Sequence, residues 1–244
     1  MTASEMDIKK NTGEVFALVR REIERFNDSL SPEEKSRAGS LQRWSAQFTL
    51  VHLAFWENHY AAVFEKGLAG ETVPVSGSYL DQLNDGVLYE HKDQPFEQAR
   101  AEEAAAYNKF LDFFERGITP QALADPTPLP YLKNFSLLNR MLRSYALHPV
   151  HHLSDYYVKN GRAERADELQ ENLSRAVGQL PMWRAEAFYK LGASYALMGW
   201  PQRALVELGK AVGENTKLRT QARADEDFES LRNMGEFEQI VGHP

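Results

Sequence analysis

The stretch WSAQFTLVHLAFWENHYAAVFEKGL, residues 44–68, decides the fold of this chain of 244 residues. Its large side chains recur every three or four residues, which places a set of them on one side of a helix: Phe48, His52, Phe55 or Trp56, and His59 or Tyr60. The spacing predicts one helix over the whole stretch, which ends near Gly67 or Gly70.

Three further segments among the first 160 residues carry the same helical period: residues 7–30, 95–117 and 131–160. Residues 70–94 contain Pro74 and three glycines without a sustained period, which predicts a long connection with at most a short turn near Leu80. A connection of this length can cross the molecule and let the helices on either side of it run parallel. Residues 120–130 hold four prolines, and we expect a second loop there.

Pro149 interrupts the last of these helical segments. It has no amide hydrogen to donate to the carbonyl of Tyr145 four residues earlier, so we expect the helix to bend or to split at this point.

The C-terminal residues follow a different pattern. From residue 185 onward, large and small side chains occupy the positions typical of a tetratricopeptide helix hairpin, namely Phe188, Leu191, Gly192, Tyr195, Gly199, Ala204, Leu208 and Ala211. We expect residues 164–177 to supply a neighbouring helix and residues 225–241 to supply a cap, because one repeat cannot bury both of its faces. The sequence therefore predicts an all-α protein with two domains, residues 1–160 and residues 161–244.

Composition excludes several classes of protein. The longest apolar run, Phe48 to Trp56, is far shorter than the roughly 20 residues of a membrane span. The start of the chain is polar and acidic and shows no secretory signal, so we expect a cytoplasmic protein. A net charge of -7 without a Lys and Arg cluster argues against a nucleic-acid partner. The chain has no cysteine, so any metal site must use histidine and carboxylate ligands.

Three motifs resemble DinB-like proteins, including the colibactin-resistance (ClbS/DfsB) type. They are Trp44-Ser45, the block VHLAFWE at residues 51–57, and HPVHH at residues 148–152. The resemblance covers about the first two thirds of the chain, and it implies a four-helix bundle with a long crossover between its second and third helices. In members that bind metal, one histidine of the second helix meets a histidine pair of the fourth. By position, these residues are His52, His148 and His152.

Helix geometry agrees with this ligand set. Residues four apart lie on one face of a helix, so His148 and His152 can share an ion, while His151 points roughly 100° away from His152. Three neutral imidazoles suit zinc, nickel or iron(II) and leave coordination positions open for water or substrate. Asp155 is a candidate to orient an imidazole, and Glu57 and Tyr156 are candidates for a base or a proton donor.

Two interpretations remain open at this stage. A single histidine among apolar neighbours, as at His52, is commonly a hydrogen-bonded core residue without a metal. The resemblance implies a metal-dependent transferase or hydrolase that acts on a small molecule in detoxification or stress response. The alternative is a noncatalytic adaptor that binds a protein partner through residues 161–244. The sequence leaves the oligomeric state undecided, with a homodimer as one option.

Overall fold

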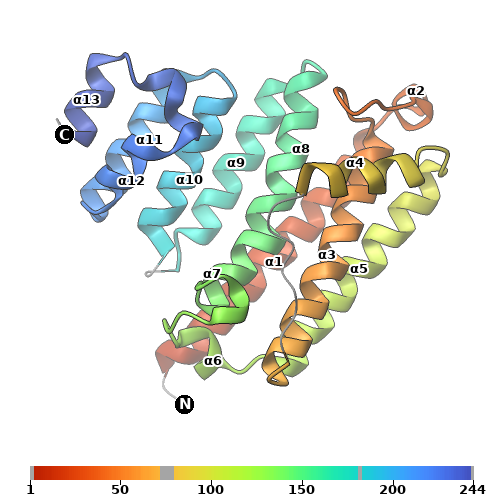
Figure 1. Cartoon of the computed structure of the whole chain (residues 1–244), viewed down its shortest axis with the longest axis horizontal. Coiled ribbons are helices and arrows are strands. Elements are labelled where there is room, and N and C mark those ends of the chain that lie inside the picture. The colour runs from red at the N-terminus through yellow and green to blue at the C-terminus, as the bar shows by residue number, and fades with distance from the viewer. Residues whose placement is uncertain (1–2, 72–79, 181–182, 243–244) are drawn as a thin grey trace. The chain divides into compact units, whose positions relative to one another are not determined.

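The computed structural model describes residues 3–71, 80–180 and 183–242, and every regular element in these ranges is helical (Figure 1). A single isolated bridge joins Leu129 to Phe135. The chain divides into two compact units, residues 1–156 and residues 157–244, with the boundary inside helix α8. Within the described ranges, no helix is both long enough and apolar enough to cross a membrane.

The N-terminal unit is built from long helices joined by short ones. Its elements are α1 (Ala3–Ser29), α2 (Pro32–Ser36), α3 (Ala46–Leu68), α4 (Leu80–Glu90), α5 (Phe96–Gly117), α6 (Pro120–Ala124), η1 (Pro130–Leu132), α7 (Leu137–Leu142), the π-helical turn η2 (Arg143–Leu147) and the greater part of α8 (His148–Lys159).

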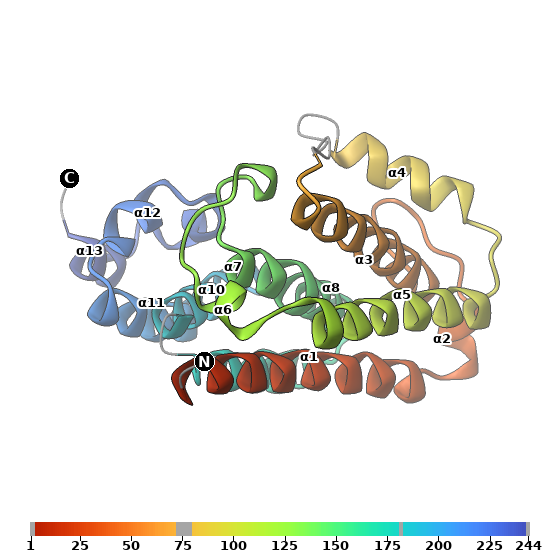
Figure 2. The ribbon, with the colours of Figure 1, turned by 90° about the horizontal axis from the view of Figure 1, so that it is seen from below.

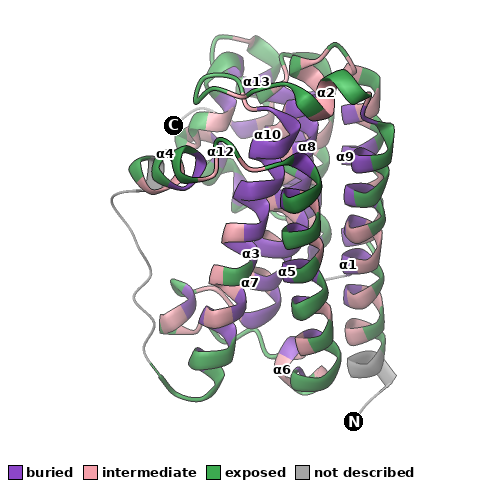
Figure 3. Cartoon of the chain, turned by 90° about the vertical axis from the view of Figure 1, so that its right-hand side faces the viewer, coloured by how far each residue is buried: buried purple, intermediate pink, exposed green. Residues whose placement is uncertain are grey.

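Helix α3 is the central element of this unit. It packs against α5 and α4, and α1 packs against α5, α6 and η2. Helices α3 and α5 run in the same direction, while α1 and α8 run in the opposite one (Figures 1 and 2). Buried residues line α3 over most of its length, whereas the outward side of α5 is exposed (Figure 3). Aromatic and aliphatic residues occur on several faces of the 44–68 stretch, as is typical of a helix that other elements cover on several sides.

Local sequence signals fix where these helices begin. The hydroxyl of Ser45 accepts a hydrogen bond from the amide of Phe48 at 3.1 Å, which caps the start of α3. A capping box starts α2: the amide of Glu34 donates to the hydroxyl of Ser31 at 3.2 Å, and the amide of Ser31 donates to the carboxylate of Glu34 at 3.0 Å. Pro95 precedes the first turn of α5.

The structure corrects the sequence prediction in two connections. Residues 80–90, expected to hold at most a short turn, form the eleven-residue helix α4. The indole nitrogen of Trp56 donates to Asn84 at 2.9 Å, and the side-chain amide of Gln47 donates to the carbonyl of His91 at 2.8 Å. These tertiary contacts with α3 stabilise a helix whose own sequence has only a weak apolar helical period. The proline-rich loop contains the short helix α6, which Thr119 caps.

The segment predicted as one helix over residues 131–160 begins at Leu137 and changes its hydrogen-bond register at η2. There the amide of His148 donates to the carbonyl of Arg143, five residues earlier. The carbonyl of Tyr145, which Pro149 cannot reach with an amide, accepts instead from the hydroxyl of Tyr107 at 2.8 Å. Pro149 therefore produces a π-helical turn directly before the first histidine of the HPVHH motif.

The C-terminal unit contains the end of α8 and the helices α9 (Ala163–Val177), α10 (Arg184–Leu197), α11 (Pro201–Glu214), α12 (Leu218–Ala224), η4 (Glu226–Leu231) and α13 (Gly235–Val241). Helices α10 and α11 make the closest pair, and α9 packs against α10. A Cβ added at Gly192 would lie 3.1 Å from the carbonyl oxygen of Ala204, so the two backbones approach closely there.

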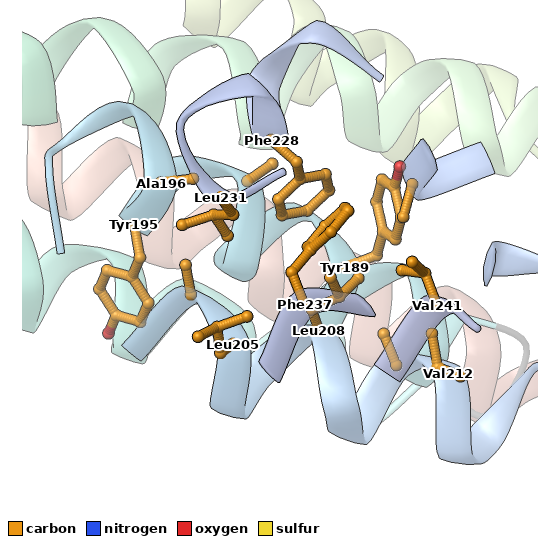
Figure 4. Packing of buried hydrophobic residues seen from close by; sticks show 14 of the residues in the cluster. Tyr189, Tyr195, Ala196, Leu205, Leu208, Val212, Phe228, Leu231, Phe237 and Val241 are labelled. Atoms are coloured by element: carbon orange, nitrogen blue, oxygen red, sulfur yellow. The ribbon is translucent and has the colours of Figure 1, made fainter. Parts of the chain in front are cut away.

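Aromatic and aliphatic side chains from α10, α11, η4 and α13 form the core of this unit, including Tyr189, Leu208, Phe228 and Phe237 (Figure 4). Gly199, with a φ of 76°, forms the turn between α10 and α11. The segment expected to cap the hairpin does pack on it, as a 3-10 helix followed by α13.

Candidate metal centre

Two helices bring three histidines of the N-terminal unit together. His52 lies in the first half of α3 and is buried, while His148 and His152 begin successive turns of α8 and are half-buried. The π-helical turn before His148 and the Ser45 cap before α3 fix the starts of these two segments. One ring nitrogen from each of the three residues lies within 4.8 Å of the other two.

The shortest distances join the Nε2 atoms. Nε2 of His148 lies 3.0 Å from Nε2 of His52 and 3.2 Å from Nε2 of His152. Two nitrogens that bind one ion at about 2.0–2.1 Å, at tetrahedral or right angles, are separated by about 2.9–3.4 Å. The observed distances therefore fit a shared divalent ion.

Hydrogen bonding alone does not account for this arrangement. A neutral imidazole Nε2 carries either one hydrogen or one in-plane lone pair, so it can make one good hydrogen bond. Nε2 of His148 is nevertheless approached by two other Nε2 atoms. An ion would satisfy all three nitrogens together, which is the physical reason to prefer a metal site over a chain of hydrogen-bonded core histidines.

The surroundings favour the neutral form of His52 and His148. Burial lowers the pKa of His52 to about 2, and the neighbouring His152 and His151 add to the shift. Burial also lowers the pKa of His148 well below its usual range, with further contributions from His52, His151 and Arg140. Neutral imidazole is the form that binds a metal ion, so ligation by His52 and His148 needs no deprotonation step at neutral pH.

Trp44 covers the histidine cluster on one side. Its ring lies 4.7 Å from the ring of His52 and stacks on that of His152, at 5.2 Å and 17°. Sequence reasoning quoted Trp44 only as part of a motif. Its contacts with both ligand rings depend on tertiary packing, which the local sequence does not show.

The remaining candidates lie elsewhere or have other contacts. His151 is exposed and contacts His152 edge-on, at 5.1 Å between ring centres, and it is not one of the three histidines whose ring nitrogens lie together. His59 is half-buried among Phe55, Trp56 and Tyr60, outside the cluster.

Of the candidate acid and base residues, Glu57 lies away from the three histidines. The carboxyl of Glu57 is buried, and the charged groups that act on it are Glu103 and Arg20. The hydroxyl of Tyr156 donates to Glu34 at 3.2 Å. Asp155 is half-buried one turn beyond the cluster. Glu57 therefore does not provide a carboxylate base at the histidines.

A comparison with protein-family models matches residues 16–155 to the DinB superfamily. The chain belongs to the DinB superfamily. The match contains all three histidines and covers more than half of the chain. No curated protein and no solved structure matches the chain significantly. The DinB match and the geometry together support a protein whose three histidines could hold a divalent metal ion.

Proposed function

We propose that this protein is a metal-dependent DinB enzyme that binds one divalent ion through His52, His148 and His152. The observation that carries the proposal is the convergence of three Nε2 atoms on one point, with two of the distances at 3.0 and 3.2 Å. Imidazole ligands favour zinc, nickel or iron(II), and a three-histidine set leaves further coordination positions for a reactant.

When bound, such an ion acts as a Lewis acid that polarises a carbonyl group or lowers the pKa of a coordinated water or thiol. The chain's own residues hold the site in place. Tyr107 satisfies the carbonyl that Pro149 leaves open, and Trp44 packs against two of the ligand rings. The expected reaction is a transfer, such as that of a thiol cofactor, or a hydrolysis, with a small molecule as substrate in detoxification or stress response.

We interpret the N-terminal unit as a DinB four-helix bundle made of α1, α3, α5 and the α7–α8 segment, in which the connection that carries α4 is the long crossover. We interpret α10 and α11 as a tetratricopeptide-like hairpin. The close approach at Gly192 and the full burial of Ala204 support this interpretation, because the motif requires small residues where its helices cross.

A second candidate function is adaptor binding by the C-terminal unit. A cavity of about 370 Å³ lies among α9, α10 and α11. Its lining combines the apolar residues Phe188 and Leu191 with charged residues of both signs: Arg175, Arg184, Lys210, Glu171 and Glu207. This mixture of apolar groups and charges of both signs is suited to a peptide segment. In this alternative the histidines would have no catalytic role.

Metal analysis of untagged protein tests the first proposal. We expect about one zinc, nickel or iron ion per chain after purification or reconstitution, and a loss of that ion in His148→Ala. A parent protein that holds no metal and takes up none on reconstitution would exclude the enzyme proposal and leave the adaptor.

A further inference from the structure

Helix α3 meets the helical run of α7, η2 and α8 at two points. At the first, Nε2 of His52 lies 3.0 Å from Nε2 of His148. At the second, the guanidinium of Arg140 in α7 lies over the ring of Tyr60 in α3, 4.6 Å from the ring centre. The two segments run in opposite directions (Figures 1 and 2), and the two contacts are about 12 Å apart along either helix. The residues between them therefore form one seam, which we call the Arg140 seam.

The Arg140 seam connects the histidine cluster to the second contact. On α3, the ring centre of Trp56 lies 6.3 Å from that of His52 and 5.5 Å from that of Tyr60, on which it stacks at 29°. On the other segment, Ser144 lies at the middle of the run and is buried. Within the described residues, neither the Oγ atom of Ser144 nor the buried Nε2 atom of His59 has a hydrogen-bond partner. The seam thus contains polar atoms that the described chain leaves unsatisfied.

Arg140 carries a positive charge that no described carboxylate neutralises. Its side chain contacts the rings of Tyr60 and Phe135, the latter at 6.0 Å, and it forms a hydrogen bond with Tyr60. Both partners are neutral, and a guanidinium has five N–H donors, so these contacts leave donors for a ligand. Arg140, Tyr60 and His59 are all half-buried, so solvent reaches this end of the seam.

The electrostatic effects on neighbouring groups agree with an unpaired charge. Burial lowers the pKa of His59, and Arg140 and then Lys133 add to the shift. Arg140 also adds to the lowered pKa of His148, after burial and the neighbouring His52 and His151. The charge of Arg140 therefore acts both at its own end of the seam and at the histidine cluster, in a protein whose net charge is -7.

From these observations we propose that Arg140 binds an anionic group of the substrate, a carboxylate or a phosphate, while the reacting part of the substrate extends along the seam to the histidines. This proposal rests on the proposed function, since it names the substrate class of the same site. Arg140 would form charge-assisted hydrogen bonds to the anion, which an arginine can make in pairs. The spacing of about 12 Å between the two ends limits the substrate to a small molecule.

The test uses two probes on full-length untagged protein, methylphosphonate for a phosphate group and acetate for a carboxylate. Each is titrated into metal-free and cobalt(II)-loaded parent, Arg140→Gln, Arg140→Lys and Arg21→Gln, and binding is followed by NMR. Arg21 is an exposed arginine of α1, so its replacement by glutamine makes the same change in net charge away from the seam. The zinc affinity of each variant is measured in parallel.

We expect at least one probe to bind the parent with or without cobalt. Its affinity should fall about tenfold in Arg140→Gln and about threefold in Arg140→Lys, because lysine keeps the charge but lacks the two-pronged donor geometry. It should not change in Arg21→Gln. The zinc affinity of Arg140→Gln should not fall, which distinguishes anion binding from a structural role that disturbs the whole site. The probe that binds more tightly identifies the anionic group.

Four results would overturn the proposal: no binding of either probe to the parent, equal affinities in the parent and Arg140→Gln, an equal loss in Arg21→Gln, or binding that requires cobalt. If Arg140→Gln does not fold, the comparison of Arg140→Lys with the parent decides, and equal affinities there would likewise overturn it. If the parent takes up no cobalt, the proposed function fails, while the titrations of metal-free protein still test Arg140 by themselves.

Discussion

The carboxyl group of Glu57 lies fully buried inside the N-terminal unit, and neither of its oxygens has a hydrogen-bond partner in the described part of the chain. Burial raises the pKa of Glu57 well above its usual range, the nearby Glu103 adds to the shift, and Arg20 opposes it. Arg20 itself contacts both oxygens of Glu103 at 2.9 Å. These surroundings favour the protonated, neutral form of Glu57 beside the ion pair of Arg20 and Glu103.

This environment predicts how Glu57→Gln changes stability. Glu57 releases its proton near its ordinary pKa of 4.5 in the unfolded protein but keeps it to a higher pH in the folded protein. The stabilisation that this gives the folded protein is therefore complete below about pH 4.5, and it is lost as the pH rises toward the pKa of Glu57 in the folded protein. Glutamine has no proton to lose. We expect the free energy of unfolding of Glu57→Gln to exceed that of the parent by about 1 kcal/mol or more at about pH 8, with a smaller difference at about pH 5.

Urea unfolding at both pH values measures this difference, and Glu90→Gln provides the control because Glu90 is exposed on α4. A difference between Glu57→Gln and the parent that does not change with pH would show that Glu57 is ionised in the folded protein.

The position of Glu57 also shows what the sequence leaves open at the residue scale. It lies five residues after His52, which is about 140° further around the helix, so the two side chains face different neighbours. The sequence does place His52, His148 and His152 together through the family motifs. It does not show which of the carboxylates near those motifs face the histidines, because that depends on how α3 is rotated against α1 and α5.

At the scale of elements, the π-helical turn connects the core to the histidine pair. The hydroxyl of Tyr107 in α5 lies 2.8 Å from the carbonyl oxygen of Tyr145 and 3.1 Å from that of Phe16 in α1. Tyr107→Phe would leave the buried Tyr145 carbonyl without this donor. We expect a loss of about 1–3 kcal/mol in the free energy of unfolding, and weaker zinc binding because His148 follows this turn directly.

Urea unfolding and zinc titration of Tyr107→Phe test the role of this hydroxyl. Tyr131→Phe is the matched control, since the hydroxyl of Tyr131 makes no hydrogen bond within the described residues. If Tyr107→Phe behaves like Tyr131→Phe in both measurements, Tyr107 does not support the turn.

The C-terminal hairpin offers a second prediction at this scale. Ala204 in α11 is 0% exposed where α10 crosses, whereas Val206, two residues later in the same helix, is 57% exposed. Ala204→Glu should lower the free energy of unfolding by about 1–3 kcal/mol from overpacking, with an added cost for a buried unpaired charge. Val206→Glu makes the same chemical change on the surface and should cost less than about 0.5 kcal/mol. Denaturation curves that overlay for the two variants would contradict the packing described for α10 and α11.

The elements with strong patterns could be predicted from sequence, and those held by tertiary contacts could not. The long helices α1, α3 and α5 follow their apolar periods to within a few residues. Helix α4 has a weak pattern and depends on Trp56 and Gln47 of α3 for its contacts. The effect of Pro149 was foreseen as a bend or a break, but the π-helical solution depends on a hydroxyl from α5 that the local sequence does not reveal.

On the scale of the whole molecule, the chain combines a DinB unit that carries the histidines with a separate helical unit that has its own core. The two proposed functions belong to different units, a metal-dependent reaction to the first and partner binding to the second. Metal affinity separates these interpretations, because only the first requires the three histidines to act together.

The most direct measurement is a calorimetric titration of zinc into metal-free, untagged parent, His148→Ala and His151→Ala at neutral pH. The Nε2 atom of His148 lies near those of both other ligands. His151 is a histidine of the same helix that is exposed, so its replacement serves as the control. The predicted result is about one zinc per parent chain, an affinity at least tenfold lower for His148→Ala, and an affinity for His151→Ala close to that of the parent. Equal affinities for the parent and His148→Ala would contradict the metal centre.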